Sequence, residues 1–277
     1  MLRRHRDLAA QFGHQADRVV AQARALGQIQ TREPEIGAQR AVTWARDHVF
    51  ERAAVMDRRV ILESALARGM GDTTHAAIER EFERRVRAGE FREITGNGID
   101  RRFTTTEMIR MEREIIARMQ DGNRRTHADP MLVSPQLRTR VEEQHPELSA
   151  AQRNAVDDIL ISREKIVGLD GVAGAGKTTA LFVIREAAVA DRYRVEGFAP
   201  TSRAAHKLAE AGMETSTLQK HLTRGERPDT GEKRLYVLDE SSLASTRQWH
   251  EFVHRLLPYD RALLVGDRRQ HEAGEAG

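Results

Sequence analysis

The stretch Gly171-Val172-Ala173-Gly174-Ala175-Gly176-Lys177-Thr178 decides the fold of this 277-residue chain. It follows the pattern GxxxxGK[ST], in which glycines allow successive backbone N–H groups to point into one concavity that binds phosphate oxygens. An apolar segment at residues 165–169 precedes it, and an apolar helical pattern follows from Thr179 to Ala190. A strand, a glycine-rich loop and a helix in this order predict a P-loop that binds a nucleotide at the helix N-terminus.

The predicted loop assigns a role to each of its polar residues. We expect Lys177 to reach the β- and γ-phosphates of ATP, and the Thr178 hydroxyl to ligate Mg²⁺. The expected nucleotide-binding residues of this segment are Gly171, Gly174, Ala175, Gly176, Lys177, Thr178 and Thr179. ATP and Mg²⁺ are therefore the predicted cofactors.

An acidic pair follows a second apolar strand, Leu235-Tyr236-Val237-Leu238. Asp239 would hold the metal ion through water, and Glu240 is placed to activate the attacking water as general base. An acidic pair after a strand is otherwise an ordinary loop cap, but its pairing with a preceding P-loop favours the catalytic interpretation.

Two further apolar runs complete the expected sheet. Residues 262–265 lead to Gln270, whose amide could contact the γ-phosphate, and residues 194–198 lead to a polar segment that begins at Pro200. Strands that alternate with helices, with candidate ligands at their carboxyl ends, predict an open parallel α/β sheet. The fold class is thus an α/β P-loop NTPase.

The front half of the chain has a different pattern. Its predicted elements are helices at about 8–26, 39–55, 57–68 and 72–88, then extended runs at 90–94 and 101–105 around an Asn-Gly turn. Three helices followed by a hairpin predict a winged-helix-like domain, in which the third helix often enters the DNA major groove.

Arginines gather on this third helix and on the hairpin. They are Arg80, Arg84, Arg85 and Arg87 on the helix, and Arg101 and Arg102 on the wing. They could contact DNA, or they could pair with Glu79, Glu81 and Glu83 on a solvated helix face. Both interpretations stay open at this point, because winged helices also serve as packing or docking units.

The resulting domain organisation has four parts. Residues 1–38 form an N-terminal helix and connector, 39–120 the winged-helix-like domain, 121–147 a linker, and 148–277 the ATP-binding lobe. The domain at 39–120 includes a helix at 106–120 whose regularly spaced methionines are core residues. The linker assignment rests on Gly122, Pro130 and Pro135 in a polar stretch.

Composition excludes several classes of protein. The chain has no cysteine, which excludes disulfide scaffolds and thiolate sites, and it has no apolar run long enough for a membrane span or a signal peptide. We therefore expect a cytoplasmic protein. The net charge of +3 is concentrated in residues 1–145, which is compatible either with nucleic-acid binding or with an arginine-rich solvated surface.

Four strings carry a resemblance to a known family: GVAGAGKTT (171–179), APTSRAAHKL (199–208), VLDESSL (237–243) and LLVGDRRQ (263–270). They resemble motifs I, Ia, II and III of superfamily 1 helicases of the RecD-like branch. The strings REFERRVRAGEF (80–91), RRFTTTEMIRMEREI (101–115) and GDRRQHEAGEAG (266–277) resemble more narrowly the helicase part of TraI/TrwC-type (MobF family) conjugative relaxases. The resemblance covers most of the chain from about residue 40 and implies that residues 148–277 form the first RecA-like lobe of a helicase.

The resemblance also implies roles for individual residues. Lys177, Thr178, Asp239, Glu240 and Gln270 would take the ATPase roles given above, and Gln152, in a segment similar to the family's Q-type motif, would contact adenine. Pro200, Thr201, Ser202 and Arg203 would line a single-stranded DNA track, consistent with hydroxyl and guanidinium contacts to phosphate. Residues 217–222 resemble the next DNA-contacting motif, although His221 alone is more typical of a satisfied core or surface residue.

The chain also departs from the family. Such a helicase has a second lobe that donates arginines to the transferring phosphoryl group, and losing such an arginine can cost about 10³ in rate. The sequence ends at Gly277, shortly after the third motif, and no tyrosine stands beside the histidine cluster of a relaxase nuclease. We expect a first lobe that binds Mg·ATP and single-stranded or duplex DNA, and that hydrolyses ATP slowly until a second lobe or other relaxase components complete it.

Two alternatives remain. One is a non-catalytic DNA- or protein-binding module with a vestigial nucleotide site, and the other is a truncated relic. The sequence does not distinguish a fragment from a split enzyme that is completed in trans.

Overall fold

The chain forms two compact units. The computed structural model describes residues 21, 33–95, 101–123, 130–171, 176–225 and 227–266. The first unit comprises Met1–Val49 and Met56–Phe103, and the second comprises Phe50–Val55 and Thr104–Gly277. The predicted helix at 8–26 (apart from residue 21), the Asn-Gly turn, Gly174, Ala175 and Gln270 lie outside the described residues.

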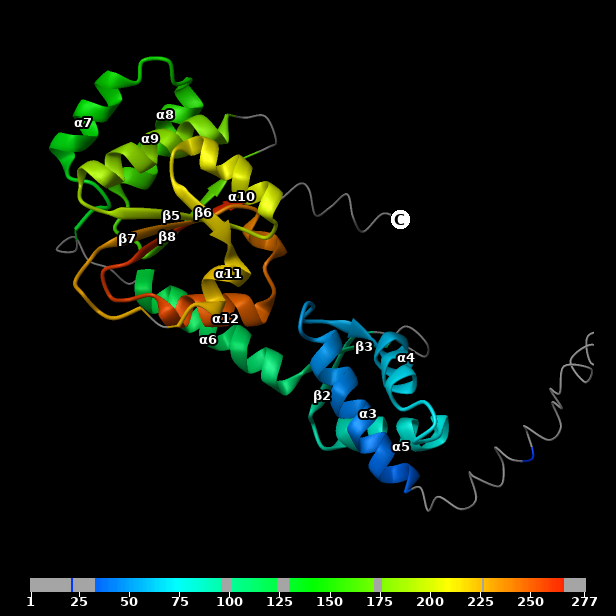
Figure 1. The fold of residues 1–277 in the computed structure, drawn as a ribbon. Helices are drawn as coiled ribbons and strands as arrows, with labels where there is room; N and C mark the ends of the chain where they lie inside the picture. The colour runs from blue at the N-terminus through cyan, green and yellow to red at the C-terminus, as the bar shows by residue number, and fades with distance from the viewer. Residues whose placement is uncertain are drawn as a thin grey trace, which may run out of the picture. The chain divides into compact units, whose positions relative to one another are not determined.

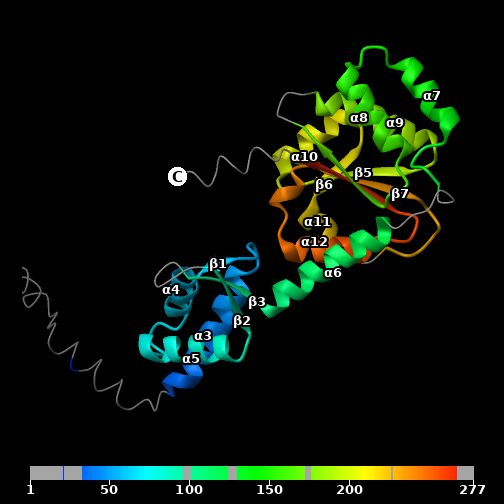
Figure 2. The ribbon, with the colours of Figure 1, turned by 180° about the vertical axis from the view of Figure 1, so that it is seen from behind.

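The first unit has the element order of a winged helix. Its elements are α3 (Pro34–Val49), β1 (Met56–Asp57), α4 (Arg58–Arg68), α5 (His75–Arg87), β2 (Phe91–Thr95) and β3 (Arg102–Thr105) (Figure 2). The strands form a small sheet in the order β1-β3-β2, with β1 antiparallel to β3. The predicted winged-helix-like architecture is therefore present.

Aromatic packing joins the helices of this unit to its sheet. Phe82 of α5 is fully buried and lies against Phe91 and Phe103, with ring centroids 4.9 and 5.2 Å away. The Thr74 hydroxyl caps α5 by accepting a hydrogen bond from the Ala77 N–H. The apolar face of α5 is thus held on the two strands that follow it in the sequence.

The second unit is built on a parallel sheet of five strands. They are β4 (Ile166–Asp170), β5 (Arg194–Ala199), β6 (Glu214–Thr217), β7 (Arg234–Leu238) and β8 (Arg261–Gly266), in the order β4-β8-β7-β5-β6. Each neighbouring pair is parallel. This sheet confirms the predicted α/β P-loop fold class. It also places β8 between the P-loop strand and β7.

Helices cover both faces of the sheet. On one face lie α7 (Pro135–Gln144), α8 (Ala150–Ile161) and α9 (Lys177–Ala190); on the other lie α6 (Thr106–Asn123), α11 (Leu218–Thr223) and α12 (Thr246–Arg255) (Figures 1 and 2). Two short 3₁₀ turns, η2 (Ala209–Ala211) and η3 (Ser241–Leu243), and helix α10 (Ser202–Leu208) complete the unit. None of the helices within the described ranges is long and apolar enough to cross a membrane.

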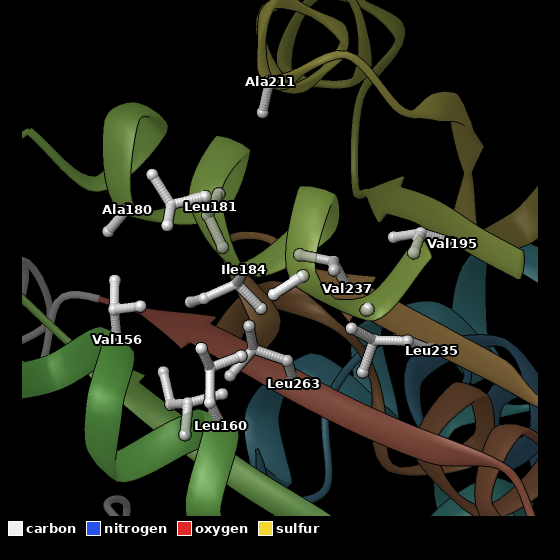
Figure 3. Close-up of a cluster of buried hydrophobic side chains, with 14 of the residues drawn as sticks. Val156, Leu160, Ala180, Leu181, Ile184, Val195, Ala211, Leu235, Val237 and Leu263 are labelled. Atoms are coloured by element: carbon white, nitrogen blue, oxygen red, sulfur yellow. The ribbon is translucent and has the colours of Figure 1, made fainter. Parts of the chain in front are cut away.

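The larger core lies under α8 and α9. Figure 3 shows Leu160 of α8, Ile184 of α9 and Leu263 of β8 converging in it, and all three side chains are almost completely buried. Since these side chains come from two helices and one strand, burying them fixes the P-loop helix against the sheet.

A second core on the opposite face is rich in aromatic rings. His221 of α11 packs against both Phe198 and Tyr236, with ring centroids 4.3 and 5.6 Å away. Burial, reinforced by nearby arginines, lowers the pKa of His221 to about 4. This histidine therefore packs as a neutral ring, in agreement with its interpretation as a core residue.

The segment predicted as a linker belongs largely to the second unit. Within residues 121–147 the chain forms α7, and Leu132, Val133 and Val141 are buried in the core under α8 and α9. Pro135 occupies the first turn of α7, which is compatible with a helix because the first turn needs no N–H donor. The proline that suggested a break therefore starts a helix.

The helix predicted at 106–120 belongs to a different domain from the one expected. The structure extends it as α6 and assigns it to the second unit rather than to the winged helix. Its Glu107 accepts two hydrogen bonds from Arg247 of α12, at 3.1 and 3.2 Å. Ile115 and Met119 pack against the second core. The apolar face of α6 is thus covered by the sheet unit.

A buried ion pair fixes the start of β8. The Asp260 carboxylate is fully buried and accepts two hydrogen bonds from Arg227, at 2.9 and 3.0 Å, and another from the Leu257 N–H. Arg227 also donates to the Glu232 carbonyl. The pair therefore ties the connection before β7 to the turn before β8.

Candidate nucleotide-binding site

The described part of the P-loop requires glycine at its last position. Gly176 is the N-cap of α9 and has φ +73°, in the left-handed region that L side chains rarely adopt. A Cβ at this position would stand 2.1 Å from Nε2 of Gln152. Both the backbone conformation and the close neighbour therefore disfavour a side chain here.

The lysine of the motif is anchored at the ends of two strands. Lys177 is the first residue of α9, and its Nζ donates to the carbonyl oxygen of Gly171 at 2.7 Å and to that of Gly266 at 3.3 Å. These carbonyls directly follow β4 and end β8. The ammonium group consequently lies at the carboxyl edge of the sheet, beside the start of a helix, where an anion is favoured.

Gln152 connects α8 to the P-loop. Its Oε1 accepts from the Ser149 N–H at 2.9 Å, which completes a capping box at the start of α8. Its Nε2 donates to the Gly176 carbonyl at 3.1 Å. Both the oxygen and the nitrogen of the amide are thus hydrogen-bonded to the protein backbone. The predicted adenine contact of Gln152 stays a prediction, whereas its position beside the loop is a structural fact.

The acidic pair follows β7 in a strained conformation. The Asp239 N–H donates to the Phe198 carbonyl at 2.8 Å, which aligns the ends of β7 and β5. Glu240 has φ 47° and ψ 40°, a left-handed conformation that costs a non-glycine residue about 1–2 kcal/mol. Residues with strained backbone conformations are concentrated at functional sites, and the surrounding structure holds them in place.

The end of β8 lies next to both parts of the site. The Gly171 N–H donates to the Gly266 carbonyl at 3.2 Å, and a Cβ added at Gly266 would lie 3.8 Å from the Ser241 hydroxyl. Ser241 begins η3, directly after Glu240. Since residues 267–270 lie outside the described ranges, the predicted γ-phosphate contact of Gln270 stays a prediction.

A cavity of about 730 Å³ opens beside the acidic pair, within the second unit. Its lining includes Pro200 after β5, Asp239 and Glu240 after β7, Gln219 of α11 and Gln248 of α12. The sequence analysis placed Gln219 within residues 217–222, which resemble a DNA-contacting motif, but it did not identify Gln248. The two amides hydrogen-bond to each other at 3.0 Å. A signal for Gln248 was present, because Ser245 and Gln248 have the spacing of a capping box at the start of α12.

The four predicted DNA-track residues lie at one turn. Pro200 lines the cavity, and the Thr201 hydroxyl caps α10 by accepting from the Ala204 N–H at 3.2 Å. Ser202 and Arg203 are exposed in the first turn of α10. The structure thus places all four together at the carboxyl end of β5.

In the first unit, most of the candidate DNA-binding arginines have carboxylate partners. Arg84 and Arg85 both bind Glu81, each with a closest distance of 2.7 Å. Arg101 pairs with Glu93 at 2.9 Å and with Glu83 at 3.3 Å. Hydrogen bonds from Arg84, opposed by burial, hold the pKa of Glu81 below its usual value. These contacts favour the interpretation that the arginines stabilise the domain, and DNA contact by this unit stays a prediction.

Comparison with known proteins gives one family match and several relatives. Residues 147–277 match the AAA domain family. The chain is 35% identical over 187 residues to the probable conjugal transfer protein TraA of Sinorhizobium fredii, and 33% identical over 188 residues to the conjugal transfer protein TraA of Agrobacterium fabrum. It is 32% identical over 138 residues to the multifunctional conjugation protein TraI of Escherichia coli K12.

The part of the second unit from residue 147 onward is therefore similar to AAA domains, a class that implies nucleotide binding. The match to TraA covers 66% of this chain and 17% of the relative, and the match to TraI covers 46% of this chain and 8% of the relative. These matches confirm the predicted resemblance: the chain is similar to the helicase portion of TraI/TrwC-type conjugative relaxases.

Proposed function

We propose that the second unit binds Mg·ATP and hydrolyses it, and that an intact relaxase-helicase couples this hydrolysis to movement along single-stranded DNA. One observation carries the proposal. Near the carboxyl edge of the sheet lie Gly176 in a left-handed helix start, the Lys177 ammonium, and Asp239 followed by the strained Glu240.

The residues fit a nucleotide with a hard divalent cation. Gly176 starts α9 in a left-handed conformation, and Lys177 supplies positive charge at the N-terminus of this helix, where phosphate is favoured. The Thr178 hydroxyl and the Asp239 carboxylate are oxygen donors of the kind that Mg²⁺ prefers. When bound, the cation neutralises charge on the phosphates. Gln152 and Gln270 are the proposed contacts to adenine and to the γ-phosphate.

Glu240 is the proposed general base. It follows Asp239 directly, it lines the cavity, and its backbone is held in an unfavourable conformation. A carboxylate so placed can orient water and accept its proton. We propose that full turnover requires arginines from a second lobe, because developing phosphoryl charge needs cations beyond Lys177.

The proposed DNA path crosses the turn after β5. Pro200, Thr201, Ser202 and Arg203 form this turn, and Ser202 and Arg203 are exposed to solvent. Hydroxyl and guanidinium groups of this kind bind phosphate without reading sequence. The relatives are named as conjugal transfer proteins, so we propose plasmid DNA in the cytoplasm as the partner.

The test is binding of a fluorescent ATP analogue with Mg²⁺ by the full chain. We expect Lys177→Ala to weaken binding at least about tenfold, equivalent to about 1.4 kcal/mol. Lys207→Ala is the matched control, since Lys207 is an exposed lysine on α10 away from the P-loop. Equal affinity in wild type and Lys177→Ala would refute nucleotide binding at this site.

Phosphate release with and without single-stranded DNA then tests the enzymatic part. We expect slow release that falls further in Glu240→Gln. Salt-dependent DNA affinity that survives Lys177→Ala, without any phosphate release, would instead favour the non-catalytic binding module.

A further inference from the structure

A cluster of metal-ligand side chains lies on the face of the second unit that carries α12. It consists of His250 and His254 on α12 and Glu114 on α6, and one ligand atom from each lies within 4.8 Å of the others. The two histidines are four residues apart on one face of the helix, and their ring centroids are 4.1 Å apart. None of the three takes part in the proposed nucleotide site.

The hydrogen bonds of the cluster leave one ring nitrogen of His254 suited to bind a metal ion. Nδ1 of His254 lies 2.7 Å from the His250 carbonyl oxygen, which can only accept, so Nδ1 carries the proton. In the neutral ring, Nε2 of His254 therefore keeps its lone pair. A backbone carbonyl that fixes the tautomer in this way is the usual support of a metal-bound histidine.

The third group supplies a negative charge. Oε2 of Glu114 lies 2.6 Å from Nε2 of His250, and Oε1 accepts from Arg110 at 2.7 Å. The carboxylate is thus already in contact with the histidine pair, and α6 and α12 pack against each other within one unit.

We propose that Glu114, His250 and His254 form a binding site for Zn²⁺ or a similar transition-metal ion, with water in the fourth position. Two imidazoles and one carboxylate are a common ligand set for zinc. With bonds of about 2.0–2.2 Å, tetrahedral ligand atoms lie about 3.3–3.6 Å apart. The present spacing, 2.6 Å for one pair and at most 4.8 Å for the others, brackets this range, so side-chain rotation suffices.

The segment His250-Glu251-Phe252-Val253-His254 has the spacing HExxH, in which zinc peptidases use the glutamate as a base. Here Glu251 is bound to Arg255, its neighbour one turn along α12. The site is therefore assigned to metal binding that cross-links α6 to α12, without a hydrolytic role.

Titration calorimetry of the chelator-treated full chain with ZnCl₂ tests the proposal. We expect a site of one zinc per chain, an affinity at least about tenfold lower in His254→Ala, and a comparable loss in Glu114→Gln. His75→Ala is the matched control: it removes another helical histidine with a glutamate four residues on, but without a second histidine. It should leave the affinity unchanged.

Cobalt(II) provides an independent readout. Bound to the wild-type chain, it should give the visible absorption of a four-coordinate ion, and His254→Ala should abolish this absorption while leaving the circular dichroism of the fold unchanged. No zinc binding, or equal zinc affinity in wild type and His254→Ala, would overturn the proposal. Neither result depends on nucleotide binding.

Discussion

Replacing Gly176 by alanine tests how the P-loop is held. The left-handed φ of +73° costs an alanine about 1–2 kcal/mol, because its Cβ approaches the following carbonyl. The new Cβ would also stand 2.1 Å from Nε2 of Gln152, so the amide must move away. This movement loses the hydrogen bond to the Gly176 carbonyl, a loss of about 1 kcal/mol. We expect a total destabilisation of about 2–3 kcal/mol and weaker nucleotide binding.

Guanidinium denaturation of the wild type, Gly176→Ala, Gln152→Ala and the double variant separates the backbone cost from the steric cost. In a Gln152→Ala background the steric conflict disappears, so Gly176→Ala should cost only the backbone term of about 1–2 kcal/mol. The two substitutions should therefore be coupled by about 1 kcal/mol. Gln152→Ala also removes the capping box of α8. Because both variants in the Gln152→Ala background lack it, its loss does not change the difference in stability between them. An equal cost of Gly176→Ala in both backgrounds would refute the contact, and a cost below about 0.5 kcal/mol would refute the strain.

Three further predictions concern other parts of the second unit. Arg227→Met should destabilise it by about 3–5 kcal/mol in urea denaturation, because Asp260 would remain buried without its cation; Arg227→Met/Asp260→Asn should recover part of this loss. His221 stays neutral in the fold down to pH 4 but is protonated below about pH 6.5 when unfolded, so stability falls by about 2–3 kcal/mol as the pH drops between these values. Denaturation midpoints of His221→Phe should not show this component of acid sensitivity. Glu240→Gly should raise stability by about 1 kcal/mol and abolish phosphate release, whereas Arg192→Gly, which relieves a similar positive φ in a turn, should only stabilise.

The sequence predicted those parts of the fold that depend on local patterns. The P-loop strand, the strand before Asp239 and the helix predicted at 72–88 have signals within a few residues, and each is present in the structure. The order of the sheet, with β8 beside β4, depends on pairing between residues about a hundred positions apart, which periodicity does not encode. The short strand β6 was missed because Glu214–Thr217 is polar and lies at the sheet edge.

The linker error has a different physical origin. Polar composition and prolines predict a loop when a segment is judged by itself. In the structure Pro135 begins α7, and a few apolar residues such as Leu132 and Val141 are enough to anchor the segment in a core supplied by α8 and α9. Tertiary packing therefore overrides a weak local preference.

In the candidate site, too, local spacing predicted some features and tertiary packing determined others. Motif spacing identified Lys177, Asp239 and Glu240, but it did not predict that Gln152 would bind the Gly176 carbonyl, because that contact depends on where α8 packs. The spacing of His250 and His254 was visible in the sequence. It became informative only when α6 brought Glu114 to the same place.

Helix α12 contacts both the turn after Glu240 and helix α6. Its Trp249 donates from Nε1 to the Ser241 carbonyl at 3.1 Å, which supports the 3₁₀ turn immediately after Glu240. The same helix binds α6 through Arg247 and His250, and α6 continues directly from strand β3. A strained residue such as Glu240 keeps its conformation only if its neighbours are fixed. The contacts between α6 and α12 are therefore part of what holds the proposed general base, although both helices lie on the face of the sheet opposite the P-loop helix.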